Sequence, residues 1–64
     1  MNKYSVKFFD DDEEEIANMP GPLNIPIFKG MEILIHGYST PFKVATWSYI
    51  YDHESELRII LESA

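Results

Sequence analysis

The sequence predicts a small all-β domain of four or five strands, folded as an antiparallel meander or a partly open barrel with one long loop and at most one short helix. Three observations predict this class. Apolar and polar residues alternate in several short segments, Gly, Pro, Asn and Asp separate these segments, and residues 42–51 are rich in aromatic and β-branched residues without Gly or Pro. A chain of 64 residues is too short for two domains, so we expect residues 1–64 to form a single one.

Residues 42–51 are expected to form a long central strand around which the rest of the chain folds. Strict alternation would divide its large side chains between two faces, and neither face would then resemble a solvent face. A β-bulge near residues 45–46 removes this conflict, because one extra residue shifts the alternation. The side chains predicted to face the core are then Phe42, Val44, Trp47 and Tyr49.

Three shorter strands are predicted by the same alternation, at residues 3–9, 31–36 and 56–62. Turn-forming residues separate them from their neighbours at residues 28–30, 37–41 and 52–55. The side chains expected to face inward from these strands and from the loop are Tyr4, Val6, Phe8, Ile27, Met31, Ile33, Ile35, Leu57, Ile59 and Leu61.

The one helix expected lies near residues 12–19. An aspartate at position 11 or 12 can cap it, Ile16 and Met19 share one face, and Pro20 ends it. Its length of about two turns makes it marginal without tertiary contacts.

Residues 20–26 contain three of the four prolines, which excludes a helix or a central strand and predicts an extended connector. The predicted order is a first strand, a long loop, a Lys-Gly turn and a three-stranded antiparallel meander with a strongly bent strand. This order over residues 3–62 resembles small SH3-like barrels. The resemblance concerns the fold pattern, and it carries no functional residue over to this chain.

Composition limits the classes of function. The chain has no Cys, which excludes disulfides and thiolate metal sites and favours the cytoplasm. No apolar run reaches the length of an export signal or a membrane span, so no membrane partner is expected. The net charge is −6, and six consecutive acidic residues account for it, since five acidic and five basic residues balance elsewhere. This charge argues against nucleic acid as a partner.

The acidic run consists of Asp10, Asp11, Asp12, Glu13, Glu14 and Glu15. Alternate carboxylates are reminiscent of a calcium loop, but Gly21 stands where such a loop has its bidentate Glu, so we predict no metal and no other cofactor. The run can be a solvated loop, or it can bind a basic surface. An acidic inhibitor that occupies the basic groove of a nucleic-acid enzyme is therefore an alternative function.

No catalytic arrangement is predicted. His36 and His53 are the only histidines, the residue type most often used as a general base, and the central strand separates them. No serine lies in a nucleophile motif, so we do not expect an enzyme. The aromatic residues of the central strand leave a third alternative, a small barrel that stacks nucleic-acid bases on its surface.

The leading hypothesis is a non-enzymatic protein-interaction module that acts through an apolar face or edge of its sheet. Leu34, Ile60 and either Ile50 or Tyr51 are predicted to face outward and to form one apolar patch. A small domain without disulfide or metal gains stability by burying such a patch. We therefore expect another protein as the partner, and a homodimer as its simplest form, through this patch or through the edge of the first or the last strand.

Overall fold

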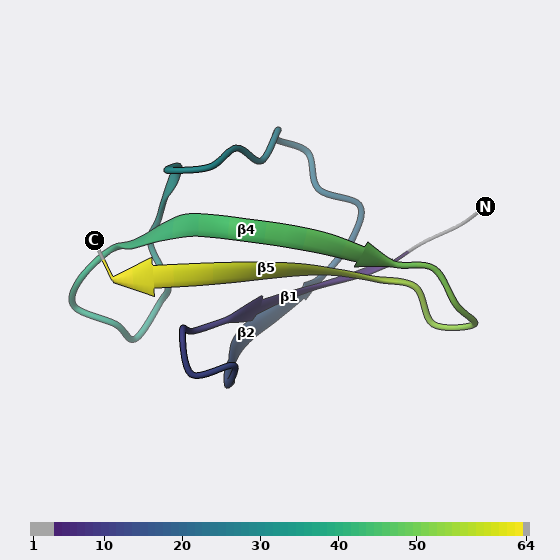
Figure 1. The fold of residues 1–64 in the computed structure, drawn as a ribbon, viewed down its shortest axis with the longest axis horizontal. Helices are drawn as coiled ribbons and strands as arrows, with labels where there is room; N and C mark the ends of the chain where they lie inside the picture. Colours follow the sequence, from purple (N-terminus) through teal and green to yellow (C-terminus); the bar gives the residue numbers. More distant parts are fainter. Residues whose placement is uncertain (1–3, 64) are drawn as a thin grey trace.

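The computed structural model describes residues 4–63 as a single curled sheet of five strands (Figure 1). The spatial order is β2-β1-β5-β4-β3, with β1 parallel to β5 and all other neighbours antiparallel. The sheet curls through 242° into a half-barrel. The predicted class, an all-β, SH3-like, partly open barrel, is confirmed. The strands are β1 (Ser5–Phe9), β2 (Glu15–Pro20), β3 (Glu32–Ile33), β4 (Phe42–Ile50) and β5 (Glu56–Ser63).

The prediction of a short helix near residues 12–19 is wrong, and β2 occupies most of that segment. A tight loop joins β1 to β2, and one carboxylate oxygen of Asp10 accepts the backbone N–H groups of Asp12 and Glu14, both at 2.9 Å. Pairing with β1 gives β2 ladder hydrogen bonds along one side and packs Ile16 and Ala17 against the core. A helix of two turns cannot match this, because its nucleation cost is recovered only over longer segments.

The three C-terminal strands form the predicted antiparallel meander, and the predicted bulge is present. The β4–β5 register shifts between Val44 and Thr46. After this shift Trp47 lies opposite Ile59, and Tyr49 lies opposite Leu57. Directly opposed residues share one face of a sheet, so the bulge turns both aromatic side chains to the inner face, as predicted.

The core is small and lies inside the half-barrel. Its buried side chains come from β1, β4 and β5, and they are Val6, Phe8, Val44, Ile59 and Leu61. Around them pack partly buried residues that include most of the predicted inward set, namely Tyr4, Ile27, Met31, Ile33, Ile35, Phe42 and Leu57. Trp47 and Tyr49 differ, because they face inward but stay 42% and 49% exposed.

The connector between β2 and β3 is extended and lies against the core, as predicted. Gly21 donates its N–H to the carbonyl oxygen of Tyr4 at 2.7 Å, so close that a Cβ atom on Gly21 would lie 2.3 Å from that oxygen. The Tyr4 hydroxyl accepts the N–H of Leu23, and the Leu23 and Ile27 side chains pack against the core. Within residues 4–63 no helix has the length and apolar character needed to cross a membrane.

Candidate protein-interaction surface

The second half of β4 has a neighbouring strand on one side only. β3 pairs with Phe42 and Lys43, and backbone hydrogen bonds from Val44 to Met31 (2.9 Å) and from Gly30 to Val44 (2.8 Å) extend this contact by one residue. Residues 46–50 pair with β5 alone among the residues that the structure describes. We call residues 46–50 the open segment of β4. One side of its backbone presents N–H and C=O groups to which no strand of the described chain is paired.

The side chains of the open segment are exposed and uncharged. All five, Thr46, Trp47, Ser48, Tyr49 and Ile50, are exposed, whereas Val44 on the other half of the strand is buried. Trp47 and Tyr49 lie on the inner face, and the other three lie on the outer face. The open segment therefore combines a free backbone edge with two half-exposed aromatic rings, which bury large areas at interfaces.

Two turns explain why β3 leaves this segment uncovered. Met31 donates its N–H to the carbonyl of Phe28, in a turn that contains Gly30 with φ of 89°. A second turn follows at once, because Tyr38 donates its N–H to the carbonyl of Ile35, with Gly37 at φ of 96°. The strand predicted over residues 31–36 is thereby limited to Glu32–Ile33.

The ring of Tyr49 lies against the ring of Tyr4, the residue just before β1. The rings of Tyr4 and Tyr49 meet edge to face, with centroids 5.6 Å apart. Because Leu23 donates a hydrogen bond to the Tyr4 hydroxyl at 3.2 Å, the connector holds Tyr4 in place. A ring that is already ordered would lose less entropy on binding, so this contact makes Tyr49 a suitable candidate for an interaction residue.

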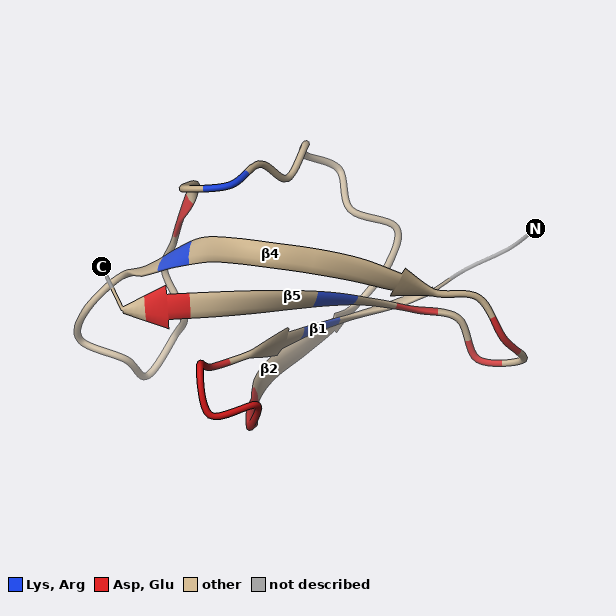
Figure 2. Ribbon diagram, in the orientation of Figure 1, with Lys and Arg blue, Asp and Glu red and all other residues tan. Residues whose placement is uncertain are grey.

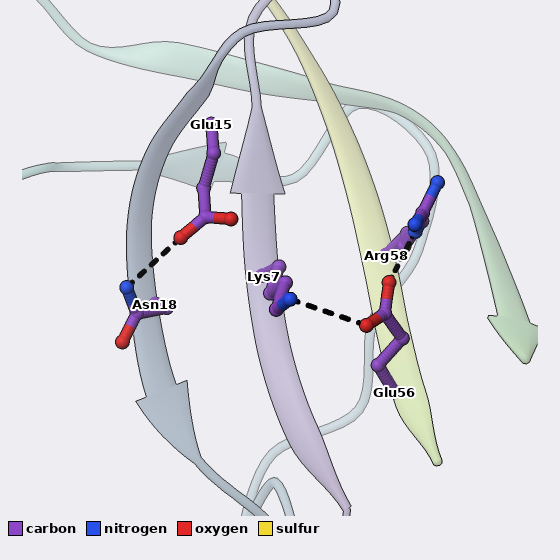
Figure 3. Close-up of polar contacts among 5 residues, drawn as sticks. All are labelled: Lys7, Glu15, Asn18, Glu56 and Arg58. Carbon is purple, nitrogen blue, oxygen red and sulfur yellow. Dashed lines mark hydrogen bonds and ion pairs between the residues drawn. The ribbon is translucent and has the colours of Figure 1, made fainter. Parts of the chain in front are cut away.

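The outer face of β1 and β5 carries a polar cluster (Figure 3). Lys7 and Arg58 both bind Glu56, and the distance from Lys7 Nζ to Glu56 Oε1 is 3.2 Å. The hydrogen bond from Arg58 is the main cause that lowers the pKa of the Glu56 carboxyl, and Lys7 adds to it. The Arg58 guanidinium also lies over the Phe9 ring, 5.4 Å from its centroid. These groups are mutually satisfied, so the cluster supports the sheet.

A hollow of about 490 Å³ lies at one end of this cluster, between the start of the connector and the β4–β5 loop. His53 lines it, but the nearby Ser55 hydroxyl donates to the Asp52 carbonyl at 3.1 Å. Lys7 and Glu56, which also line the hollow, pair with each other. We assign no chemistry to it. The lining residues are Tyr4, Ser5, Lys7, Pro20, Gly21, His53, Glu54, Ser55 and Glu56.

The acidic loop, residues 10–15, has one structural role that the sequence did not indicate. Asp10 is partly buried and organises the turn through its two backbone hydrogen bonds, whereas Asp11 and Asp12 are exposed. One carboxylate oxygen from each of these three residues lies within 4.8 Å of the others. One Asp10 oxygen is already engaged by the turn, so this proximity follows from the loop conformation and is not assigned to a metal.

The predicted outer patch is not brought together. Ile60 lies opposite Thr46, and a polar row of Ser48 and Arg58 separates it from Ile50 at one end of β4. Leu34 follows β3 at the other end, beyond a charged row in which Lys43 faces Glu32 and Glu62. The side chains of Leu34 and Tyr51 are 76% and 82% exposed.

The strand edges predicted for pairing are covered. β1 lies between β2 and β5, and β5 lies between β1 and β4, so neither is an edge. β2 is an edge, but it is poorly suited to pairing. Gly21 directs its N–H to β1, so Pro20 by alternation faces the open side, where proline has no N–H to donate. Glu15 adds charge to the same strand.

Sequence reasoning did not place Trp47 and Tyr49 among the candidate interaction residues, and the structure leaves both half-exposed. Both were assigned to the core from the bulge. Their exposure follows from the two turns that shorten β3, and the sequence does not signal this, because the six residues between Gly30 and Gly37 would fit a strand of ordinary length. No protein-family model, no curated protein and no solved structure matches this chain significantly. The arguments on function therefore rest on the geometry alone.

Proposed function

We propose that this protein is a non-enzymatic interaction module that accepts an extended segment of another polypeptide as an additional strand beside the open segment of β4. The observation that carries the proposal is the run of five exposed, uncharged residues with a strand on one side only within the described chain. In this mode of binding, main-chain hydrogen bonds provide affinity and alternate side chains provide specificity.

The side chains on the two faces would play different roles in such a complex. Trp47 and Tyr49 offer aromatic area on the inner face, where a partner side chain would complete the cover of the half-barrel. The proposed partner is a protein, and the proposal needs no cofactor, membrane or nucleic acid. The cytoplasm is the proposed compartment, because the chain contains no Cys.

An acidic inhibitor of a nucleic-acid enzyme is the second candidate. Figure 2 shows a cluster of acidic residues at the β1–β2 loop. None of residues 10–15 forms an ion pair among residues 4–63. Affinity carried by this loop would fall steeply as salt is raised, whereas affinity carried by the open segment would change little.

The test is affinity capture from the native cell with three matched variants. Trp47→Ala removes the aromatic contact of the open segment, Phe28→Ala removes a similarly exposed ring from the connector, and a third variant carries Asn and Gln throughout residues 10–15. A partner lost only with Trp47→Ala supports the proposal. A partner lost only when the acidic loop is neutralised, in a salt-dependent manner, contradicts it and supports the inhibitor.

A further inference from the structure

We infer that the strand that completes β4 comes from a second copy of this chain, which pairs antiparallel with the open segment about a twofold axis at Ser48. This inference rests on the proposed function and names its partner. The result would be one continuous sheet across two half-barrels, held by the same five residues of each copy.

The sequence of the open segment is self-complementary in this register. Ser48 meets the partner's Ser48, while Trp47 lies opposite the partner's Tyr49 and Tyr49 opposite the partner's Trp47. Aromatic pairs opposite one another are among the favourable cross-strand pairs, and the twofold axis makes this pair twice. Thr46 then lies opposite Ile50 on the outer face, again twice.

The length of the open segment selects the same register. β3 begins to pair one residue before the bulge, where Gly30 bonds to Val44, so an incoming strand has no room beyond residue 46. At the other end β4 stops at Ile50 and the chain turns into the β4–β5 loop. Only pairing centred on Ser48 uses all five residues without meeting β3 of the other copy. By alternation, about two or three of them direct both N–H and C=O to the partner.

Charge permits a second copy at this edge. Each chain carries a net charge of −6, so two copies repel each other unless their acidic regions stay apart. The acidic loop joins β1 and β2, and β5 separates β1 from β4 in the sheet (Figure 2). The open segment itself has no charged residue. An antiparallel dimer thus places its contact on an uncharged segment of a strand that is not adjacent to β1 or β2.

The other two strand edges, on β2 and β3, are poorly suited to pairing, so the assembly stops at two copies. β2 lacks the Pro20 N–H on its open side and carries Glu15, and β3 contains only two residues. Short or charged edges resist further pairing. Once two open segments have paired, the edges left among the described residues are β2, with its proline and charge, and the two-residue β3, so a dimer is expected and a growing fibre is not.

The test uses two opposite charges at the proposed axis. Ser48 is exposed on the outer face, so Ser48→Glu and Ser48→Lys are expected to fold, which circular dichroism verifies. In the dimer, either variant would place two like charges directly opposite each other. Sedimentation equilibrium is measured at high micromolar concentration for wild type, each variant, their equimolar mixture and the control Ser39→Glu, which adds the same charge in the loop before β4.

The wild type and Ser39→Glu are expected to dimerise, with a blue shift of Trp47 fluorescence. Each Ser48 variant alone should raise the dissociation constant about tenfold or more, and the mixture should recover association as a heterodimer. A monomeric wild type overturns the inference, and so does a mixture that fails to recover. If the wild type is monomeric but still captures a partner that Trp47→Ala loses, the proposed function stands with a different chain as the occupant. If it does neither, both proposals fail.

Discussion

β2 and the open segment of β4 both present unpaired backbone to solvent, yet only β2 carries features that oppose strand pairing. β2 ends in Pro20, contains Glu15 and follows the acidic loop. The open segment has no proline and no charge, and it has two half-exposed aromatic rings. Proteins normally protect a free edge with charge, proline or shortness, so the lack of these features supports the proposal that the open segment pairs with another strand.

The largest effect on stability is expected from the residue of β5 that pairs with Trp47 of the open segment. Ile59, directly opposite Trp47, is fully buried, so Ile59→Ala should lower the free energy of unfolding by about 2–5 kcal/mol. Ile60 is only partly buried on the outer face, and Ile60→Ala should cost about 1 kcal/mol. Urea unfolding of both variants measures this difference. Equal losses would mean that the inner and outer faces of β5 are assigned wrongly, and with them the face of Trp47.

A smaller effect on stability is expected from the loop that leads into β2, the protected edge. Asp10→Ala removes the acceptor of two backbone N–H groups in the β1–β2 loop and should lower stability by about 1 kcal/mol. Asp11→Ala, which removes the same charge from an exposed position, should change stability by less than about 0.5 kcal/mol. Thermal unfolding of the pair decides it. An Asp11 effect as large as that of Asp10 would show that charge, not the turn, determines the loop.

The pH dependence of stability tests the polar cluster of Lys7, Glu56 and Arg58, which links β1 to β5 in the middle of the sheet. Arg58 and Lys7 lower the pKa of Glu56 below its ordinary value of 4.5. A carboxyl with a lowered pKa in the folded state contributes stability that is fully present above its unfolded pKa and is lost as the pH falls through the folded pKa. Between about pH 5 and pH 3 the wild type should therefore lose more stability than Glu56→Gln. Parallel curves for the two proteins would contradict the role of the cluster.

The smallest effect is expected from neutralising the acidic loop without touching its turn. Changing residues 11–14 to Asn and Gln keeps the Asp10 hydrogen bonds and removes like charges that repel one another. The melting temperature should stay the same or rise slightly, and association through the open segment should strengthen slightly at low salt. A marked loss of stability would reveal a bound cation or an ion-pair network.

The sequence predicted the class of fold because its strongest signals are local. Alternation located β1, β4 and β5, and the crowding of large residues on both faces of β4 predicted the bulge before Thr46. The helix was predicted wrongly because capping and i, i+3 spacing are also local signals, whereas pairing with β1 is a tertiary contact that overrides them.

The candidate site was less predictable, because it depends on what is absent from one side of a strand. Alternation correctly turned Trp47 and Tyr49 inward, but their exposure follows from the two-residue length of β3. The residues of the predicted outer patch, Leu34, Ile60 and Tyr51, lie apart for a related reason. Strand register determines which outward residues become neighbours, and the pattern of a single strand does not contain the register.

Amide hydrogen exchange measured by NMR, residue by residue and over a range of protein concentration, tests the difference between the two edges most directly. The account predicts that about two or three amides within residues 46–50 gain protection as the concentration rises, because they donate to the second copy. The amide of Asn18 on β2 should exchange at the same rate throughout. Concentration-independent exchange in the open segment, or protection that grows at Asn18 instead, would contradict the account.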